Sequence, residues 1–163
     1  MPDLESILVT QVGPDRQGLA LSFKGHKGYI TARDLSDGTM LTLGLLSILH
    51  GPQQPDLLCV EEPETGLHPR RLRWLFDHML GLAYPGEGKP RRQVILTTHS
   101  PDLLNLFSDI PEAVKVVEQV IGPIGQRVSR VTPLPEILSK LYPEGGTVES
   151  IGHAWATGLY EQL

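Results

Sequence analysis

The chain has 163 residues, of which 40% are hydrophobic and 20% are charged, and its formal net charge is -5. This composition is that of an ordinary globular protein and argues against a disordered or fibrous one. The negative balance provides no overall positive field that would attract nucleic acid or an anionic membrane. A single cysteine, Cys59, excludes an intrachain disulfide framework and fits a reducing cytoplasm.

The ends and apolar runs of the chain give no sign of export or of membrane insertion. The first ten residues, MPDLESILVT, lack a basic segment followed by a long apolar one, so we predict no signal peptide. The longest apolar run, residues 40–49, is too short to cross a bilayer. We therefore expect a cytoplasmic protein with no membrane partner.

The predicted elements alternate between strands and helices. In chain order we expect strands at 7–9, 19–23 and 29–31, a helix at 40–50, a strand at 57–60, a helix from Pro69, a strand at 94–96, a helix from Pro101, a strand at 113–121, and helices at 135–141 and 148–160. This order predicts an α/β fold with a mainly parallel sheet flanked by helices. One domain is expected, with a β-rich lead-in at 1–34, a core at 35–110, and a strand with helices at 111–163.

The strand at 57–60 is predicted to be buried on both faces, because it is a short apolar run of the kind found in parallel sheets. Cys59 lies within that run. We therefore expect it to be a buried small hydrophobic residue rather than a nucleophile.

An acidic pair, Glu61 and Glu62, follows this strand directly. In α/β sheets, ligands bind at the carboxyl ends of strands. Because neighbouring side chains of a strand point to opposite sides, the two carboxylates can serve different purposes. One can hold a hydrated magnesium ion, and the other can orient or deprotonate an attacking water. The alternative is that both carboxylates simply end the strand in solvent.

Two further segments combine polar side chains with the end of an element. In Thr97-Thr-His-Ser-Pro101 a histidine, His99, follows a strand and can donate to an anionic oxygen. In Ser36-Asp37-Gly38-Thr39 the predicted start of a helix offers free N–H groups that favour phosphate. Each segment alone also fits a local role, as a structurally bonded histidine and as a simple helix N-cap.

Together these segments resemble the ATP-binding-cassette superfamily, in particular the AAA-family predicted ATPases related to the RecF and SMC proteins. The similarity covers residues 34–102 closely. It implies the C-terminal part of an ABC-type P-loop NTPase fold, with Glu61 as the Walker B carboxylate that supports magnesium and Glu62 as the catalytic glutamate. Glu61 stands where aspartate is commoner in the family, so its carboxylate is displaced by one methylene.

The resemblance also implies roles for the remaining motif residues. His99 corresponds to the histidine of the H-loop, which senses the γ-phosphate. The signature loop, which binds nucleotide held by the opposite subunit, corresponds to Ser36, Asp37, Gly38 and Thr39, with Asp37 in place of a glycine. The D-loop, which contacts that subunit, corresponds to residues 65–68 and includes Gly66 and His68.

One motif of the family does not occur in these 163 residues. The Walker A pattern is missing, and its nearest candidate, Gly86-Glu-Gly-Lys-Pro90, lacks a glycine and the Ser or Thr. The resemblance implies ATP and Mg²⁺ as cofactors, and a homo- or heterodimer with a Walker A-bearing half or a second ATPase subunit as the partner. Because family members place Walker A upstream of the signature loop, we expect that half before residue 1 and expect this chain alone to be inactive.

Other functions stay open at this point. A degenerate relative would act as a non-hydrolysing regulatory or interaction module, and a metal-dependent nuclease would use Glu61, Glu62 and Glu64. DNA is a further candidate partner because two basic clusters are present, at residues 70–73 and 89–92. DNA repair and phage defence are both compatible with the resemblance.

Overall fold

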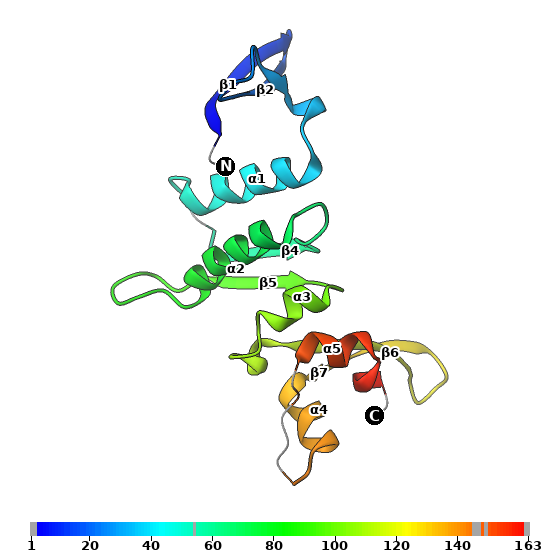
Figure 1. Ribbon diagram of the computed structural model, residues 1–163. Helices are drawn as coiled ribbons and strands as arrows, with labels where there is room; N and C mark the ends of the chain where they lie inside the picture. Colours follow the sequence, from blue (N-terminus) through cyan, green and yellow to red (C-terminus); the bar gives the residue numbers. More distant parts are fainter. Residues whose placement is uncertain (1–2, 54, 145–147, 149, 162–163) are drawn as a thin grey trace.

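The computed structural model describes residues 3–53, 55–144, 148 and 150–161, and its elements succeed one another along an elongated molecule (Figure 1). The strands and helices are β1 Leu4–Gly13, β2 Arg16–Phe23, β3 Ile30–Thr31, α1 Asp37–His50, β4 Leu57–Glu61, α2 Pro69–Ala83, β5 Gln93–Thr97, α3 Pro101–Asn105, β6 Lys115–Ile121, β7 Arg127–Pro133, α4 Leu134–Leu141 and α5 Ile151–Ala156. Single 3₁₀ turns lie at Ala32–Asp34, Pro111–Ala113 and Leu159–Glu161.

The N-terminal segment is a small antiparallel sheet in the order β1-β2-β3, and its strands lie within the predicted lead-in. β1 is longer than the predicted strand at 7–9. Its apolar residues are largely exposed, with Ile7 at 54% and Val9 at 61%. No single face of β1 is buried, so its ends carry no pattern of apolar residues. The sequence therefore indicated only the middle of the strand.

The central layer consists of the parallel pair β4–β5 and the helices α1 and α2. An apolar cluster joins α1, β4 and α2 and consists of Leu45, Leu49, Leu58, Val60, Leu75 and Met79. β4 alternates between buried and exposed residues along its length. Leu58 and Val60 face the cluster, so the opposite face of the strand is left open.

The open face of β4 and β5 corrects two predictions. Leu57 is 46% exposed and Ile95 is 55% exposed, so the strand at 57–60 is not buried on both faces. Cys59 is also exposed and is not a core residue. Both predictions assumed that helices cover both faces of a parallel sheet, whereas the described helices cover one face of this pair.

The C-terminal unit is built from the β6–β7 hairpin, α4 and α5. Its apolar cluster consists of Val114, Leu134, Ile137, Ile151, Ala154 and Tyr160. β7 is absent from the predicted elements because most of its residues are exposed and its sequence has no clear apolar alternation. The terminal helix is shorter than predicted, since Gly158 adopts a positive φ of 70° just beyond α5.

Tyr160 holds the two ends of this last segment together. Its hydroxyl donates to the carbonyl of Ile151 at 3.2 Å. Burial of the phenol, and secondarily the neighbouring Tyr142, raises the pKa of Tyr160 above its ordinary value. Tyr160 therefore stays neutral and hydrogen-bonded over the physiological pH range.

The prediction of a mainly parallel sheet is wrong, although the α/β class is confirmed. The described strands form three separate sheets, and only β4–β5 is parallel. The strand predicted at 113–121 pairs with β7 instead of joining the central pair. A short turn can close an antiparallel hairpin, whereas a parallel neighbour needs a long crossover. Within the described part of the chain, no helix has the length and apolar character needed to cross a membrane.

Candidate active site

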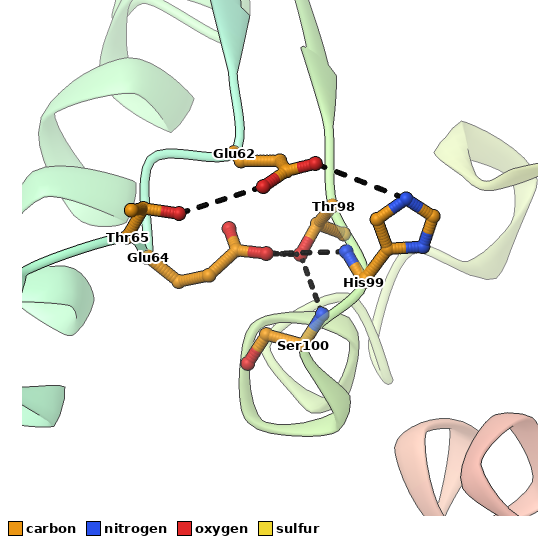
Figure 2. Close-up of polar contacts among 6 residues, drawn as sticks. All are labelled: Glu62, Glu64, Thr65, Thr98, His99 and Ser100. Carbon is orange, nitrogen blue, oxygen red and sulfur yellow. Dashed lines mark hydrogen bonds and ion pairs between the residues drawn. The ribbon is translucent and has the colours of Figure 1, made fainter.

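The carboxyl ends of β4 and β5 bring two sequence motifs together. The parallel register pairs Glu61 with Thr97, so the residues that follow each strand leave the sheet side by side (Figure 2). The amide of Glu62 continues this pairing by donating to the Thr97 carbonyl at 3.0 Å. The site therefore depends on strand register, which the buried face of β4 fixes.

Glu62 and His99 face each other across this edge. Glu62 Oε1 lies 3.8 Å from His99 Nε2, and the two side chains are 47% and 78% exposed. The Thr65 hydroxyl approaches the other carboxylate oxygen at 3.5 Å. A carboxylate that can accept a proton thus stands beside an imidazole that can donate one, and both are open to a substrate.

The backbone of Glu62 is unusual. Its φ is +41°, and among the described non-glycine residues only Glu62 has a positive φ. Such a conformation costs on the order of 1–3 kcal/mol and is often found at functional sites. The strand ends at Glu61, so the expected alternation of Glu61 and Glu62 along an extended strand does not hold.

Glu61 is the last residue of β4 and lies on the exposed face of that strand. Its carboxylate supplies the hard oxygen atoms that Mg²⁺ prefers. Within the described residues no group of three or more His, Cys, Asp or Glu side chains could hold a metal ion by itself. Mg²⁺ commonly uses one or two carboxylates together with water and substrate phosphate, and Glu61 fits that kind of site.

Glu64 is a site residue whose contacts the sequence did not predict. Its Oε1 accepts hydrogen bonds from the Thr98 hydroxyl at 2.6 Å and from the His99 amide at 3.1 Å (Figure 2). Its Oε2 is buried and has no partner in the described structure. In the sequence, Glu64 stands out only as a third carboxylate close to the acidic pair Glu61 and Glu62.

Trp155 is a second neighbour of His99 that sequence reasoning did not identify. The two rings are stacked, with centroids 6.4 Å apart and an interplanar angle of 27°. Both residues border a groove of about 1060 Å³ that lies between β5 and the C-terminal unit. The fold alone brings Trp155 of α5 to this position, because α3 packs against α5.

Ser36 acts as the N-cap of α1. Its Oγ accepts from the Thr39 amide at 3.3 Å and lies 2.9 Å from the Thr39 hydroxyl. Asp37 is the first residue of the helix, and its negative charge interacts favourably with the positive end of the helix dipole. The segment is thus a well-formed helix start, and its role in binding phosphate stays a prediction.

Replacing Ser36 with Ala should lower the free energy of unfolding by about 1 kcal/mol, since it removes an N-cap acceptor. Chemical denaturation of the isolated chain measures this effect. Ser108, whose hydroxyl donates to the Asn105 carbonyl outside any N-cap, provides a matched Ser→Ala control. Equal losses at both positions would contradict the capping role of Ser36.

Gly38 packs directly against the predicted D-loop. It is buried, and a Cβ built on it would overlap the carbonyl oxygen of Gly66 and lie 3.1 Å from Leu67 Cδ2. Gly66 has a positive φ of 76°, which glycine adopts without strain. The segments predicted as signature loop and D-loop therefore contact each other within one chain.

His68 also has a local role in the structure. It is the N-cap of α2, and its Nδ1 accepts from the Arg70 amide at 3.2 Å. Pro69 follows at the first helical position, as the sequence predicted. The structure thus places Glu62 with His99, and Gly38 with Gly66, while the 62–68 loop connects the two groups.

The basic clusters are partly used within the chain. Arg73 pairs with Asp77 at 3.3 Å, Arg92 pairs with Asp56, and the Arg91 guanidinium lies 5.1 Å from the centroid of the Tyr84 ring. These contacts give three of the basic side chains an intramolecular role. DNA binding by the clusters stays a hypothesis.

Comparison with known proteins covers the same region. A family model described as an AAA domain, putative AbiEii toxin of a type IV toxin–antitoxin system, matches residues 8–105. The match extends from β1 to the end of α3 and includes every motif residue discussed above. No curated protein matches the chain.

Proposed function

Because the chain belongs to this AAA-domain family of putative AbiEii toxins, we propose that it supplies the hydrolytic half of an ABC-type, RecF-related ATPase. The observation that carries the proposal is the Glu62–His99 pair at 3.8 Å, held at the carboxyl ends of two parallel strands. Ligands of α/β sheets bind at this edge. The AAA-domain match supports an ATPase-like function, and the finer assignment rests on the site residues.

In this proposal each residue of the site has a distinct task. Glu62 orients a water molecule and takes up its proton as the water oxygen attacks the γ-phosphorus. The bond from that phosphorus to the bridging oxygen breaks, and ADP leaves. His99 donates a hydrogen bond to a γ-phosphate oxygen, where negative charge must be stabilised. Glu61 would help to hold Mg²⁺, and the bound ion would neutralise phosphate charge.

The phosphate cradle must come from a segment outside these 163 residues, since they contain no Walker A pattern. The open face of β4 and β5 supports this division, because parallel strands are normally covered on both faces. We propose that a Walker A-bearing half, in the same polypeptide or in a partner, completes the sheet. In the head-to-tail dimer the 36–39 loop would then contact nucleotide held by the opposite subunit.

Two alternatives receive less support from the structure. A nuclease that uses Glu61, Glu62 and Glu64 would need the three carboxylates to converge on metal ions. Glu64 is instead bound to Thr98 and His99, and its second oxygen is buried. A non-hydrolysing module remains the runner-up. It differs from the main proposal in that it would form a complex without hydrolysing ATP. Among cellular processes, the family description favours a toxin–antitoxin setting over DNA repair.

Nucleotide binding tests the proposal. The chain alone should bind Mg-ATP weakly, and the chain assembled with a Walker A-bearing half, in the same polypeptide or in a partner, should bind at least tenfold more tightly, as measured by calorimetry. Equal binding by the chain alone and by the complex would contradict the split. Tight complex formation without hydrolysis would favour the regulatory module.

A further inference from the structure

Glu64 connects two loops that are distant in the sequence. Its Oε1 accepts from Thr98 and from the amide of His99, which are 34 and 35 residues away. These two hydrogen bonds tie the loop after β4 to the loop after β5. Glu62 and His99 belong to the same two loops, so their separation depends on this connection.

The backbone around His99 has little other support. β5 ends at Thr97 and α3 begins at Pro101, so residues 98–100 belong to neither element. The Thr98 hydroxyl donates to Glu64 and accepts from the Ser100 amide at 2.9 Å. Glu64 therefore holds the peptide before His99 directly, through the His99 amide. It holds the peptide after His99 indirectly, because the Ser100 amide donates to the Thr98 hydroxyl that Glu64 binds.

The second oxygen of Glu64 indicates that this arrangement has a cost. Oε2 is buried without a hydrogen-bond partner among the described residues. A buried polar atom without a partner lowers the stability of the fold. Because this oxygen does not stabilise the fold, the presence of a carboxylate here needs another explanation. The other oxygen, Oε1, provides one, because it is a strong acceptor that binds two donors at once.

We infer that Glu64 is a positioning residue that sets the place of His99 relative to Glu62 and takes no part in the chemistry itself. Only the kinetic consequence of this inference rests on the proposed ATPase function. The structural consequence can be measured on the chain alone.

Amide hydrogen exchange, measured residue by residue by NMR, tests the structural consequence. Glu64→Ala should speed the exchange of the His99 amide by about tenfold or more, because it removes the carboxylate oxygen that accepts from this amide, and hydrogen bonds to charged groups are stronger than neutral ones. The amide of Val94 within β5 should be unaffected. Glu64→Gln should retain most of the protection of His99, because the amide oxygen of glutamine can accept the same two hydrogen bonds.

Two further variants complete this experiment. Glu87→Ala removes an exposed carboxylate from the loop at 84–90 and should change nothing at His99. Thr98→Val keeps the shape of the side chain and removes the hydroxyl that donates to Glu64, so it should speed exchange of the His99 amide even if Glu64→Ala fails to fold. Unchanged exchange of the His99 amide in Glu64→Ala or in Thr98→Val would overturn the inference.

The kinetic consequence is measured in the assembled ATPase. Glu64→Ala should lower kcat by roughly 10- to 100-fold, the cost of a misplaced group, with little change in KM for ATP. Glu64→Gln should retain most of the activity. Absence of turnover by the wild-type assembly would count against the proposed function and leave the exchange result intact. Normal kcat in Glu64→Ala beside an active wild type would instead refute the positioning role alone.

Discussion

Glu62→Gln is expected to lower kcat of the assembled ATPase by about 10²- to 10⁴-fold, the contribution typical of a general base. Glutamine keeps the shape of the side chain but cannot take up the proton of the attacking water. The release of phosphate under saturating Mg-ATP measures the effect. Because ATP binding does not need the proton acceptor, affinity for ATP should be preserved, and unimpaired turnover would contradict the role of Glu62.

The strained backbone of Glu62 provides a control that separates chemistry from folding. Glu62→Gly should abolish turnover as completely as Glu62→Gln, yet stabilise the fold by about 1 kcal/mol, because glycine tolerates the φ of +41°. Glu62→Gln should leave the free energy of unfolding nearly unchanged. A loss of stability in both variants would indicate that Glu62 is mainly a structural residue.

Gly38→Ala is expected to destabilise the chain by about 3 kcal/mol, at the upper end of the usual cost of overpacking. The new methyl group would overlap the carbonyl oxygen of Gly66, and backbone cannot move away as easily as a flexible side chain. Urea denaturation of the isolated chain measures the change.

Gly44 is a matched control for this prediction. It lies in the same helix, is exposed, and has no atom within 4 Å of the position a Cβ would take. Gly44→Ala should therefore stabilise the chain by up to about 1 kcal/mol, through the higher helix propensity of alanine. Equal effects of the two substitutions would contradict the contact between α1 and the 62–68 loop.

This contact changes how a loss of function at Gly38 should be interpreted. The resemblance gives Gly38 a role in contacting nucleotide bound by the opposite subunit. The structure adds a role within the chain, since Gly38 supports the loop that begins with Glu62. An inactive Gly38 variant therefore shows a lost nucleotide contact only if its stability is also measured.

The starts of helices and the ends of strands that carry the motifs were predictable from the sequence, because local chemistry determines them. Pro69 and Pro101 are the first residues of α2 and α3, where the sequence placed them. The apolar runs before Glu61 and before Thr97 form the expected parallel pair. That pair brings the loops that contain Glu62 and His99 to the same edge of the sheet.

The contacts that link these motifs could not be predicted, because they depend on the arrangement of the elements in space. Glu64 has no sequence feature that distinguishes it from any other carboxylate near a strand end. The exposure of Cys59 depends on what covers the second face of β4, and an apolar run alone does not specify this. β7 was missed because an exposed hairpin strand has no buried face to impose alternation on its sequence.

Steady-state phosphate release tests the central claim most directly. The chain and the Walker A-bearing half, each produced as a separate polypeptide, are assayed separately and as a mixture, with Mg-ATP in excess. The account predicts turnover by the mixture that clearly exceeds the sum of the two separate rates. A mixture that forms a complex and binds ATP, but releases phosphate no faster than the Walker A-bearing polypeptide alone, would contradict it.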